Sequence, residues 1–427
     1  MNDLELTIID KKLSTKYTGW KEVSVSLSLN RLAGLFEISA VEELSKQGEG
    51  WNLRMGQSCV VKIKGQTVIT GYIDYIDESY DEKSHRILIK GRDKTCDLVD
   101  CSYVPEDYTK IETHEWNNQT ALTVITALCE PFNNITVNSD ASVKEAATEL
   151  LAKFKVSVGE TAGDAIKRIC NAKGIMPMSK GDGNLYLTRA GTKSCYGTII
   201  RGKNVKKGRL LQTDRERFSH YFVRGKGVSK RVNLFSQEIN PIALVQDEVV
   251  MQQVYGANRK TTEIRYRPKV LTTDIISNFT IDTSLKTTAQ TGTTTQKVIA
   301  EVNICKTRGE QEARIRAGKS RALYYTLYSW FQNPKRADFQ AEKIWPVNNL
   351  VNVYDPTLKV EGTYLITDVR FNFSEGDGST TDLILMKKDA YMILRKPIRK
   401  IVTSSDQLFS SEALREMGFT TETFLNK

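Results

Sequence analysis

The side chains that could support catalysis are few, and their spacing does not favour it. The three histidines, His85, His114 and His220, lie outside any HExxH motif, Cys/His cluster or GxSxG motif. Gly181-Asp-Gly has the composition of a hairpin turn, and the sequence holds no phosphate-binding GxxxxGK[ST] motif. We therefore expect no catalytic centre, and structural roles for His85 and His220, which fall in or beside expected strands.

Carboxylates and thiols gather in one short segment without the spacing of a metal site. Asp93, Asp97 and Asp100 are close together, but at a short helix start such residues are more often caps and solvated charge. Cys96 and Cys101 are five apart and would lie on different helical faces. The seven cysteines lack paired CxxC spacing, which indicates reduced, mostly buried thiols and assembly in a cytosol. We expect no metal and no cofactor.

Positive charge is concentrated in the second half of the chain. Residues 1–200 hold 24 Lys+Arg against 27 Asp+Glu, a net −3, and residues 201–427 hold the other 37 against 24, a net +13. This asymmetry fits a surface that meets phosphate or an acidic partner, and on charge alone it fits a solvated lysine-rich surface equally well. No zinc finger, RNP-type aromatic pair or helix-turn-helix accompanies the basic runs, so sequence-specific nucleic-acid binding is not expected.

Residues 1–94 read as strands throughout. The segments 4–9, 22–29, 34–41, 58–64, 66–76 and 84–90 are rich in Val, Ile, Thr and aromatic residues, and most of them alternate in polarity. Lys64–Gly65–Gln66 predicts a tight hairpin. Six strands in such a short stretch favour a small antiparallel barrel, because closing a sheet removes its exposed edges.

Residues 95–205 predict a small α+β domain. Gln119–Glu130 has one apolar helical face and is stopped by Pro131. Gly159–Lys173 predicts a second helix, ended by Gly174 as its C-cap. A hairpin follows, with strands at 175–179 and 185–189 around a KGDGN turn.

Residues 206–397 return to strands and predict a second β-barrel. The strands expected at 208–214, 219–227, 263–271, 350–354, 362–373 and 380–386 are interrupted by a helix at 308–322. The Thr-rich stretch 276–297 shows little periodicity and predicts a surface loop inserted in this domain. Two barrels in one chain suggest an internal duplication.

Residues 398–427 form a C-terminal tail that keeps Phe419, Phe424 and Leu425 apolar. It could dock on a neighbour or fold back on its own domain, and both readings are equally supported. No run of eighteen apolar residues predicts a membrane span. The N-terminus lacks the basic and apolar regions of a secretory signal.

The segment His85–Val104 carries a resemblance to a known family. Gly71-Tyr-Ile-Asp in one strand, followed by GRDKTCDLVDC from Gly91, resembles the start of the Mu-like phage baseplate hub protein (tail protein P), a family related to the late control protein D family. Further similar segments are Trp116–Pro131, Asp214–Gly225, Arg265–Lys269 and Trp345–Val353. Together the similar segments cover most of residues 1–391. None of them is catalytic, so the resemblance rests on the number of matching segments and on their order along the chain.

The resemblance implies a structural protein with two tail-tube-like barrels joined by the α+β domain. It implies a homotrimer that joins a six-fold tail tube to a three-fold spike in the virion baseplate, beside wedge or other baseplate proteins, after assembly in the host cytoplasm. DNA would pass through its channel without sequence-specific binding. The candidates for channel-facing or partner-facing residues are basic: Lys203, Lys206, Lys207, Arg209, Arg224, Lys226, Lys230 and Arg231.

Three alternatives remain open from the sequence. A hub of a DNA-free contractile device (tailocin) would have the same sequence features, and neighbouring genes for capsid and terminase would separate the two. A baseplate cell-wall hydrolase would need a Glu/Asp pair in a cleft, and no separate lytic domain is visible. A sheet-based nucleic-acid binder would need tight duplex binding at physiological salt.

Overall fold

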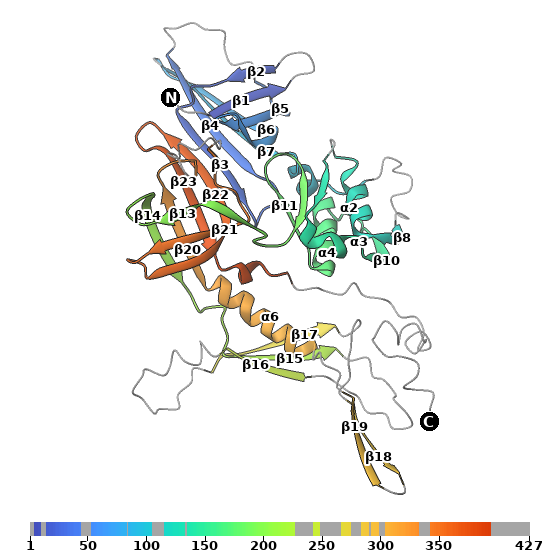
Figure 1. Ribbon diagram of the computed structural model, residues 1–427. Helices are drawn as coiled ribbons and strands as arrows, with labels where there is room; N and C mark the ends of the chain where they lie inside the picture. The colour runs from blue at the N-terminus through green and yellow to red at the C-terminus, as the bar shows by residue number, and fades with distance from the viewer. Residues whose placement is uncertain are drawn as a thin grey trace. The chain divides into compact units, whose positions relative to one another are not determined.

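The computed structural model divides the chain into two compact units, each of which is described by itself (Figure 1). The first unit comprises Met1–Thr213 and Arg321–Ile393, and the second comprises Asp214–Ser320 and Leu394–Lys427. The structure describes residues 4–9, 14–43, 53–82, 84–104, 115–132, 135–226, 242–247, 266–274, 283–289, 292–298, 304–332 and 342–393. The predicted tail, His114, Lys230 and Arg231 lie outside these residues.

A thirteen-stranded sheet forms the frame of the first unit. Its backbone path runs β14-β20-β23-β22-β3-β4-β7-β6-β5-β1-β2, with β21 paired to β22 and β13 paired to β21. The strands are β1 Leu4–Ile9, β2 Ser14–Tyr17, β3 Glu22–Ser28, β4 Leu35–Glu43, β5 Ser58–Ile63, β6 Gln66–Tyr80, β7 Ser84–Asp93, β13 Lys193–Ile200, β14 Val205–Gln212, β20 Arg321–Leu327, β21 Asn349–Asp355, β22 Val360–Ser374 and β23 Gly378–Met386.

One pairing scheme occurs twice in this sheet. In the N-terminal set β3 pairs with β4, β4 with β7, β7 with β6 and β6 with β5. In the C-terminal set β14 pairs with β20, β20 with β23, β23 with β22 and β22 with β21. The long strands β6 and β22 each contain a register shift, between Ile73 and Tyr75 and between Ile366 and Asp368. This repeated topology agrees with the internal duplication that the sequence suggested.

The two sets are joined edge to edge within the chain. The outer half of β22 pairs antiparallel with β3, from Asp368 opposite Ser28 to Ser374 opposite Glu22. The prediction of a mainly β fold is confirmed. No closed barrel is found among the described strands, so the two-barrel arrangement stays a prediction.

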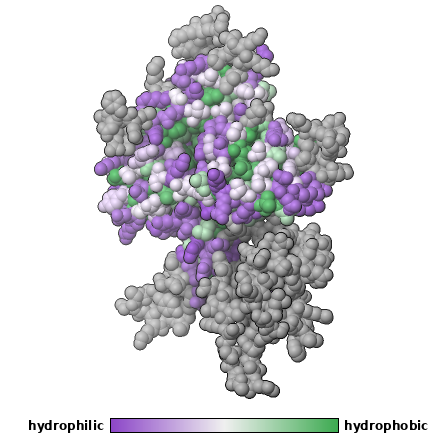
Figure 2. Space-filling model, turned by 45° about the vertical axis from the view of Figure 1, so that its right-hand side comes forward, coloured by the Kyte–Doolittle hydropathy of each residue, from purple (hydrophilic) through white to green (hydrophobic). Residues whose placement is uncertain are grey.

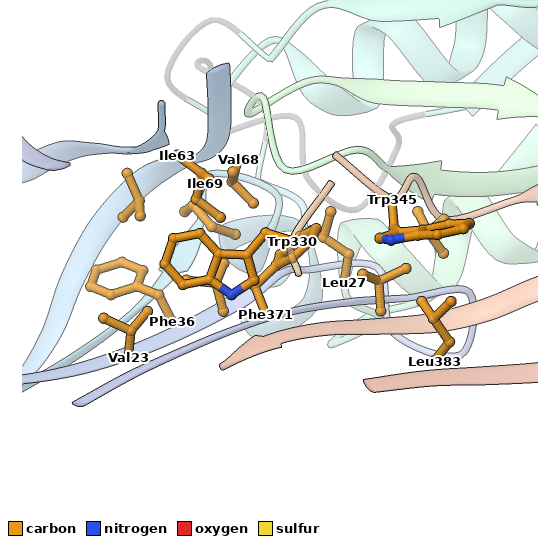
Figure 3. Close-up of a cluster of buried hydrophobic side chains, with 14 of the residues drawn as sticks. Val23, Leu27, Phe36, Ile63, Val68, Ile69, Trp330, Trp345, Phe371 and Leu383 are labelled. Atoms are coloured by element: carbon orange, nitrogen blue, oxygen red, sulfur yellow. The ribbon is translucent and has the colours of Figure 1, made fainter. Parts of the chain in front are cut away.

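The core lies on one face of this sheet because its strands alternate in polarity. Val23, Phe36, Phe371 and Leu383 point to this side and are 3% exposed or less. Trp330 packs among them, and its indole nitrogen donates to the backbone oxygen of Asn372 at 2.8 Å (Figure 3). Both sets contribute to one hydrophobic cluster, so burial of apolar surface stabilises the junction between them.

The α+β segment of the first unit follows the sequence prediction closely. The helix α4 ends at Gly174, which adopts the left-handed conformation at φ 68°. The predicted hairpins at Lys64–Gly65 and around Gly181 are both present. The elements are α1 Cys96–Asp100, β8 Glu115–Thr120, α2 Ala121–Cys129, β9 Val137–Ser139, η2 Ala141–Val143, α3 Lys144–Thr148, β10 Leu150–Lys155, α4 Ala162–Lys173, β11 Met176–Ser179, β12 Leu185–Thr188 and, after β23, η3 Lys388–Tyr391.

The second unit contains a three-stranded sheet covered by a helix. The strand β15 (His220–Lys226) lies between β16 (Ile242–Gln246) and β17 (Pro268–Asp274), and the helix α6 (Ile304–Lys319) packs on β15 and β16. Gly309 of α6 lies so close that a Cβ there would be 2.7 Å from Val245 Cγ2.

Two sequence predictions for this region are wrong. The strands at 219–227 and 263–271 were expected to join the last β block, but β15 pairs only with β16 and β17 among the described strands. The Thr-rich stretch was expected to be a loop, but β18 (Thr283–Ala289) and β19 (Gly292–Val298) form an antiparallel hairpin. Threonine is β-branched and favours strands, and here this propensity outweighs the weak periodicity.

Candidate functional site

The face of the thirteen-stranded sheet that lies opposite the core is polar. A single row across five strands reads Lys207, Thr326, Asp382, Arg370 and Ser26. Residues two positions away along each strand share this face, because side chains alternate. We call this surface, from β14 to β6, the polar sheet face. Figure 2 shows hydrophobic residues only in small groups between hydrophilic ones on the view drawn there.

The polar sheet face has a depression of about 420 Å³ between β14 and β3. The carboxylates in it are held by neutral donors, since Asp382 accepts from Thr326 Oγ1 at 2.6 Å and from Asn372 Nδ2 at 2.7 Å. Four cations line the depression, and none of them forms an ion pair within the described residues: Arg31, Lys207, Arg209 and Arg370. The depression therefore carries mixed charge with an excess of cations, because only Asp368 and Asp382 line it beside these four residues.

The structure divides the basic candidates between several environments. Lys207 and Arg209 lie on the polar sheet face and are exposed. Lys206 points to the opposite side of β14 and forms an ion pair with Asp377. Lys203 lies exposed in the turn before β14.

The remaining candidates belong to the second unit or lie outside the described residues. Arg224 is exposed on β15, and Lys226 ends that strand. Lys230 and Arg231 are outside the described residues. Sequence reasoning missed Arg370, because only the strand pairing shows that it shares a face with Lys207. It also missed Arg31, which follows β3 and lines the depression.

A buried carboxylate connects the end of β7 to the α+β segment. Asp93 is 0% exposed. Its Oδ2 accepts from the Gly34 backbone at 2.7 Å and from Ser179 Oγ at 2.8 Å, and its Oδ1 accepts from the Thr95 backbone at 2.9 Å. Burial raises the pKa of the Asp93 carboxyl, although these hydrogen bonds act to lower it. The sequence analysis treated Asp93 as cap or solvated charge, and this reading is wrong because β4, β7 and β11 enclose the side chain.

Three glycines, at positions 71, 91 and 181, lie where two backbone segments approach too closely for a side chain. A Cβ at Gly71 would lie 1.8 Å from the Arg92 carbonyl oxygen, and one at Gly91 would lie 2.1 Å from the Tyr72 carbonyl oxygen. At Gly181, with φ +84°, a Cβ would lie 1.8 Å from the Val68 carbonyl oxygen. These three glycines therefore allow β6, β7 and the β11–β12 turn to pack closely against one another.

Arg92 connects the two halves of the motif that runs from Gly71 to Cys101. Its Nε lies 2.6 Å from Asp74 Oδ2, and its Nη1 lies 2.7 Å from Asp100 Oδ2. Burial lowers the pKa of Arg92, but the hydrogen bonds to the two carboxylates outweigh this effect and raise it. Asp100 is thus a structural partner of Arg92 and not part of a carboxylate cluster.

The described thiols and histidines occupy structural environments. Cys59, Cys96, Cys129 and Cys170 are buried and free, as predicted, and burial raises the pKa of Cys59 and Cys129 to about 12. His220 stacks on Phe222 with ring centroids 6.3 Å apart. Within the described ranges, no group of three or more His, Cys, Asp or Glu residues is arranged to hold a metal ion. None of the described helices is long and apolar enough to cross a membrane.

The fold and the motif are similar to those of phage tail proteins of the baseplate. Two family models match adjacent segments: "Mu phage baseplate assembly protein GpP-like, N-terminal" over residues 13–93, and "Baseplate hub protein gp44-like, second domain" over residues 95–189. The chain is 26% identical over 401 residues to baseplate hub protein gp44 of Escherichia phage Mu, covering 94% of this chain and 93% of that protein. Over nearly its whole length the chain is thus similar to baseplate hub and tail proteins of Mu-like phages.

Two solved structures share the fold. The 43 kDa tail protein of prophage MuSo2 from Shewanella oneidensis superposes with a TM-score of 0.68 at 26% identity, covering 91% of this chain and 99% of that one. The tail protein from Neisseria meningitidis MC58 superposes with a TM-score of 0.64 at 18% identity, covering 92% and 99%. The two relatives at 26% identity are named as a baseplate hub protein and a tail protein, which agrees with the expectation that this chain is not an enzyme.

Proposed function

We propose that this protein is the structural hub of a contractile phage-tail baseplate. Three copies form a ring that adapts a six-fold tail tube to a three-fold spike, and the ring encloses the channel for genome ejection. The partners are further copies of the chain, the spike, the tail tube and wedge or other baseplate proteins. The protein resides in the virion tail after assembly in the host cytoplasm.

The observation that carries this proposal is the doubled strand set. Each chain holds the pairing scheme twice, in β3 to β7 and in β14 to β23. Three chains therefore present six similar sets, which is the number that a six-fold tube requires, while the chains themselves keep three-fold symmetry. In this proposal each strand set belongs to one of the two predicted tail-tube-like barrels.

The polar sheet face is the proposed wall of the channel. It is hydrophilic, so it can remain hydrated, and its cations alternate with Asp382, Asp368 and Glu37. A wall of mixed charge lets a polyanion pass without holding it, because binding strength grows with the number of phosphates neutralised. Of the basic residues that the sequence indicated as channel-facing or partner-facing, Lys207 and Arg209 belong to this proposed wall.

The mass of the purified protein in solution tests the proposal. Light scattering on a gel-filtration column is expected to give about three chains, on the order of 145 kDa from the 48.2 kDa subunit. Negative-stain microscopy of that fraction is expected to show a ring with a central hole. A chain that stays monomeric at every concentration, and also in the presence of its spike, would contradict the trimeric hub.

A further inference from the structure

Besides the end strands β2 and β13, two open strand edges among the described residues lie at the ends of the polar sheet face. The strand β14 pairs on one side only, with β20. The long strand β6 pairs with β5 only as far as Tyr72, so its outer half from Asp74 to Tyr80 is open on the side away from β7. Open strand edges are sites where another strand can add, and proteins that stay monomeric usually block them.

The chain itself contains a template for pairing these two edges. In the repeated scheme β22 corresponds to β6, and β3 corresponds to β14. The outer half of β22 pairs with β3 within the chain. The equivalent pairing, of the outer half of β6 with β14, is not made within the chain and is left for a second copy.

Strand direction permits this pairing in a closed ring. The path from β14 to β6 contains eight strands, each antiparallel to its neighbour. The first and last strands therefore run in opposite directions. When one copy follows another head to tail, β6 and β14 meet antiparallel, and the alternation continues through the junction.

The register follows from equivalent positions. Tyr75 follows the register shift of β6 as Asp368 follows that of β22. In the N-terminal set the paired positions lead across the strands from Tyr75 to Ser24. In the C-terminal set they lead from Asp368 to Arg209, so Arg209 is the counterpart of Ser24. Asn372 lies opposite Ser24 within the chain, so Ser79 is expected opposite Arg209 of the next copy.

The side chains at these positions complement one another. In this register Asp81 meets Lys207 directly, and Asp77 lies diagonal to Arg209, so each cation gains an acidic neighbour. Lys207 and Arg209 form no ion pair within the described part of the chain. Tyr80, which is 84% exposed, lies opposite Gly208 in this register, where the glycine leaves room for the ring beside Tyr325.

We infer that β14 of one copy pairs antiparallel with the outer half of β6 of the next copy, with Ser79 opposite Arg209. This inference rests on the proposed trimeric hub and adds the strands and the register that close its ring. The interface is heterologous, so each copy uses both edges and the polar sheet face becomes continuous through all junctions.

Disulfide trapping tests the register. In a Cys101→Ser background, which removes an exposed native thiol, Ser79→Cys with Arg209→Cys places two thiols directly opposite each other across the junction. Mild oxidation is expected to give covalent dimers and trimers on a non-reducing gel, and reductant is expected to remove them. The matched control, Ser79→Cys with Leu210→Cys, moves one thiol to the opposite face of β14 and is expected to give little cross-linking.

A charge-reversal cycle tests the same junction without a covalent bond. Arg209→Glu and Asp77→Lys are each expected to weaken association about two- to fivefold per junction. The two changes combined in one chain are expected to restore it. Lys193→Glu, an exposed reversal away from both edges, serves as the control and is expected to leave the mass unchanged.

The outcomes separate this inference from the proposed function. If the unmodified protein has the mass of three chains but the opposed cysteines do not cross-link better than the control pair, the edge pairing is wrong and the trimeric hub stands. If the unmodified protein never exceeds one chain in mass, the trimer and the edge pairing both fail. Far-UV circular dichroism of every variant confirms that a loss of mass is not a loss of fold.

Discussion

At the scale of single residues, the buried Asp93 is the position whose role differs most from its appearance in the sequence. Its carboxylate holds Gly34, Thr95 and Ser179, which belong to segments far apart in the chain. The Thr95 hydroxyl also lies 3.0 Å from the Leu32 carbonyl oxygen. Asp93 therefore fixes the position of the α+β segment against the sheet.

Replacing Asp93 is expected to destabilise the protein strongly. Asp93→Ala leaves buried donors of Gly34, Thr95 and Ser179 without an acceptor, and each costs about 1–3 kcal/mol, so the loss should exceed about 3 kcal/mol. Asp97→Ala in the same segment is the control, and it should cost less than about 1 kcal/mol. Urea unfolding followed by circular dichroism measures both. Equal losses for the two variants would show that the buried hydrogen bonds contribute little.

The same residue should make stability depend on pH. Because the folded pKa of Asp93 is raised above the ordinary 3.8, the folded state binds the proton more tightly than the unfolded state. The Asp93 contribution is therefore complete below pH 3.8 and is lost as the pH rises through the folded pKa. Asp93→Asn should remove this component from the urea-unfolding free energy measured across a pH series. An unchanged pH profile in that variant would contradict the assignment.

At the scale of elements, the β11–β12 turn is held against β6 by backbone contact. The Thr70 backbone nitrogen donates to the Gly181 carbonyl oxygen at 2.6 Å, and the Gly181 Cα faces the Val68 carbonyl. A side chain at this position requires the turn to move away from β6. The close contact between the β11–β12 turn and β6 therefore requires a glycine at position 181.

A pair of glycine substitutions isolates this contact. Gly181 and Gly202 have nearly the same φ, +84° and +83°, but a Cβ at Gly202 would meet nothing within 4 Å. Gly202→Ala is expected to cost only the left-handed strain of about 1–2 kcal/mol. Gly181→Ala is expected to cost about 1–3 kcal/mol more, because the turn must shift. Differential scanning calorimetry compares the two variants. Equal melting temperatures would mean that the contact between the turn and β6 adds no cost to a side chain at position 181.

At the scale of the whole molecule, the proposed channel wall of mixed charge predicts weak contact with DNA. The purified protein is expected to bind duplex DNA without sequence preference, with a Kd on the order of 10⁻⁶ to 10⁻⁴ M at physiological salt. Affinity should fall as salt rises, because only phosphate contacts contribute. Fluorescence anisotropy with two unrelated duplexes of equal length measures this. Tight binding to one of them would favour a nucleic-acid-binding function over passive passage.

Salt should also weaken the ring itself if charged strand edges join it. Lys207, Arg209 and their acidic partners are exposed, so their attraction is screened as the Debye length falls from about 10 Å at 0.1 M to about 3 Å at 1 M. Sedimentation velocity at increasing salt should show more monomer. Arg209→Glu combined with Asp77→Lys should keep this salt dependence, whereas Arg209→Glu alone should reverse or remove it.

The sequence by itself determined most local elements and the resemblance to the baseplate hub proteins. Alternation defined the strands, Gly174 ended α4, and the Gly71 and Gly91 motifs carried the resemblance, because these signals act over a few residues. It also gave no reason to expect an enzyme.

Only the tertiary structure decided which distant residues share a surface. Pairing of β14, β20, β23 and β22 aligns Arg370 with Lys207. Burial of Asp93 needs three separate segments, and the open edges of β6 and β14 are defined by the pairing of the other strands. These properties depend on contacts between residues hundreds of positions apart, which no local pattern encodes.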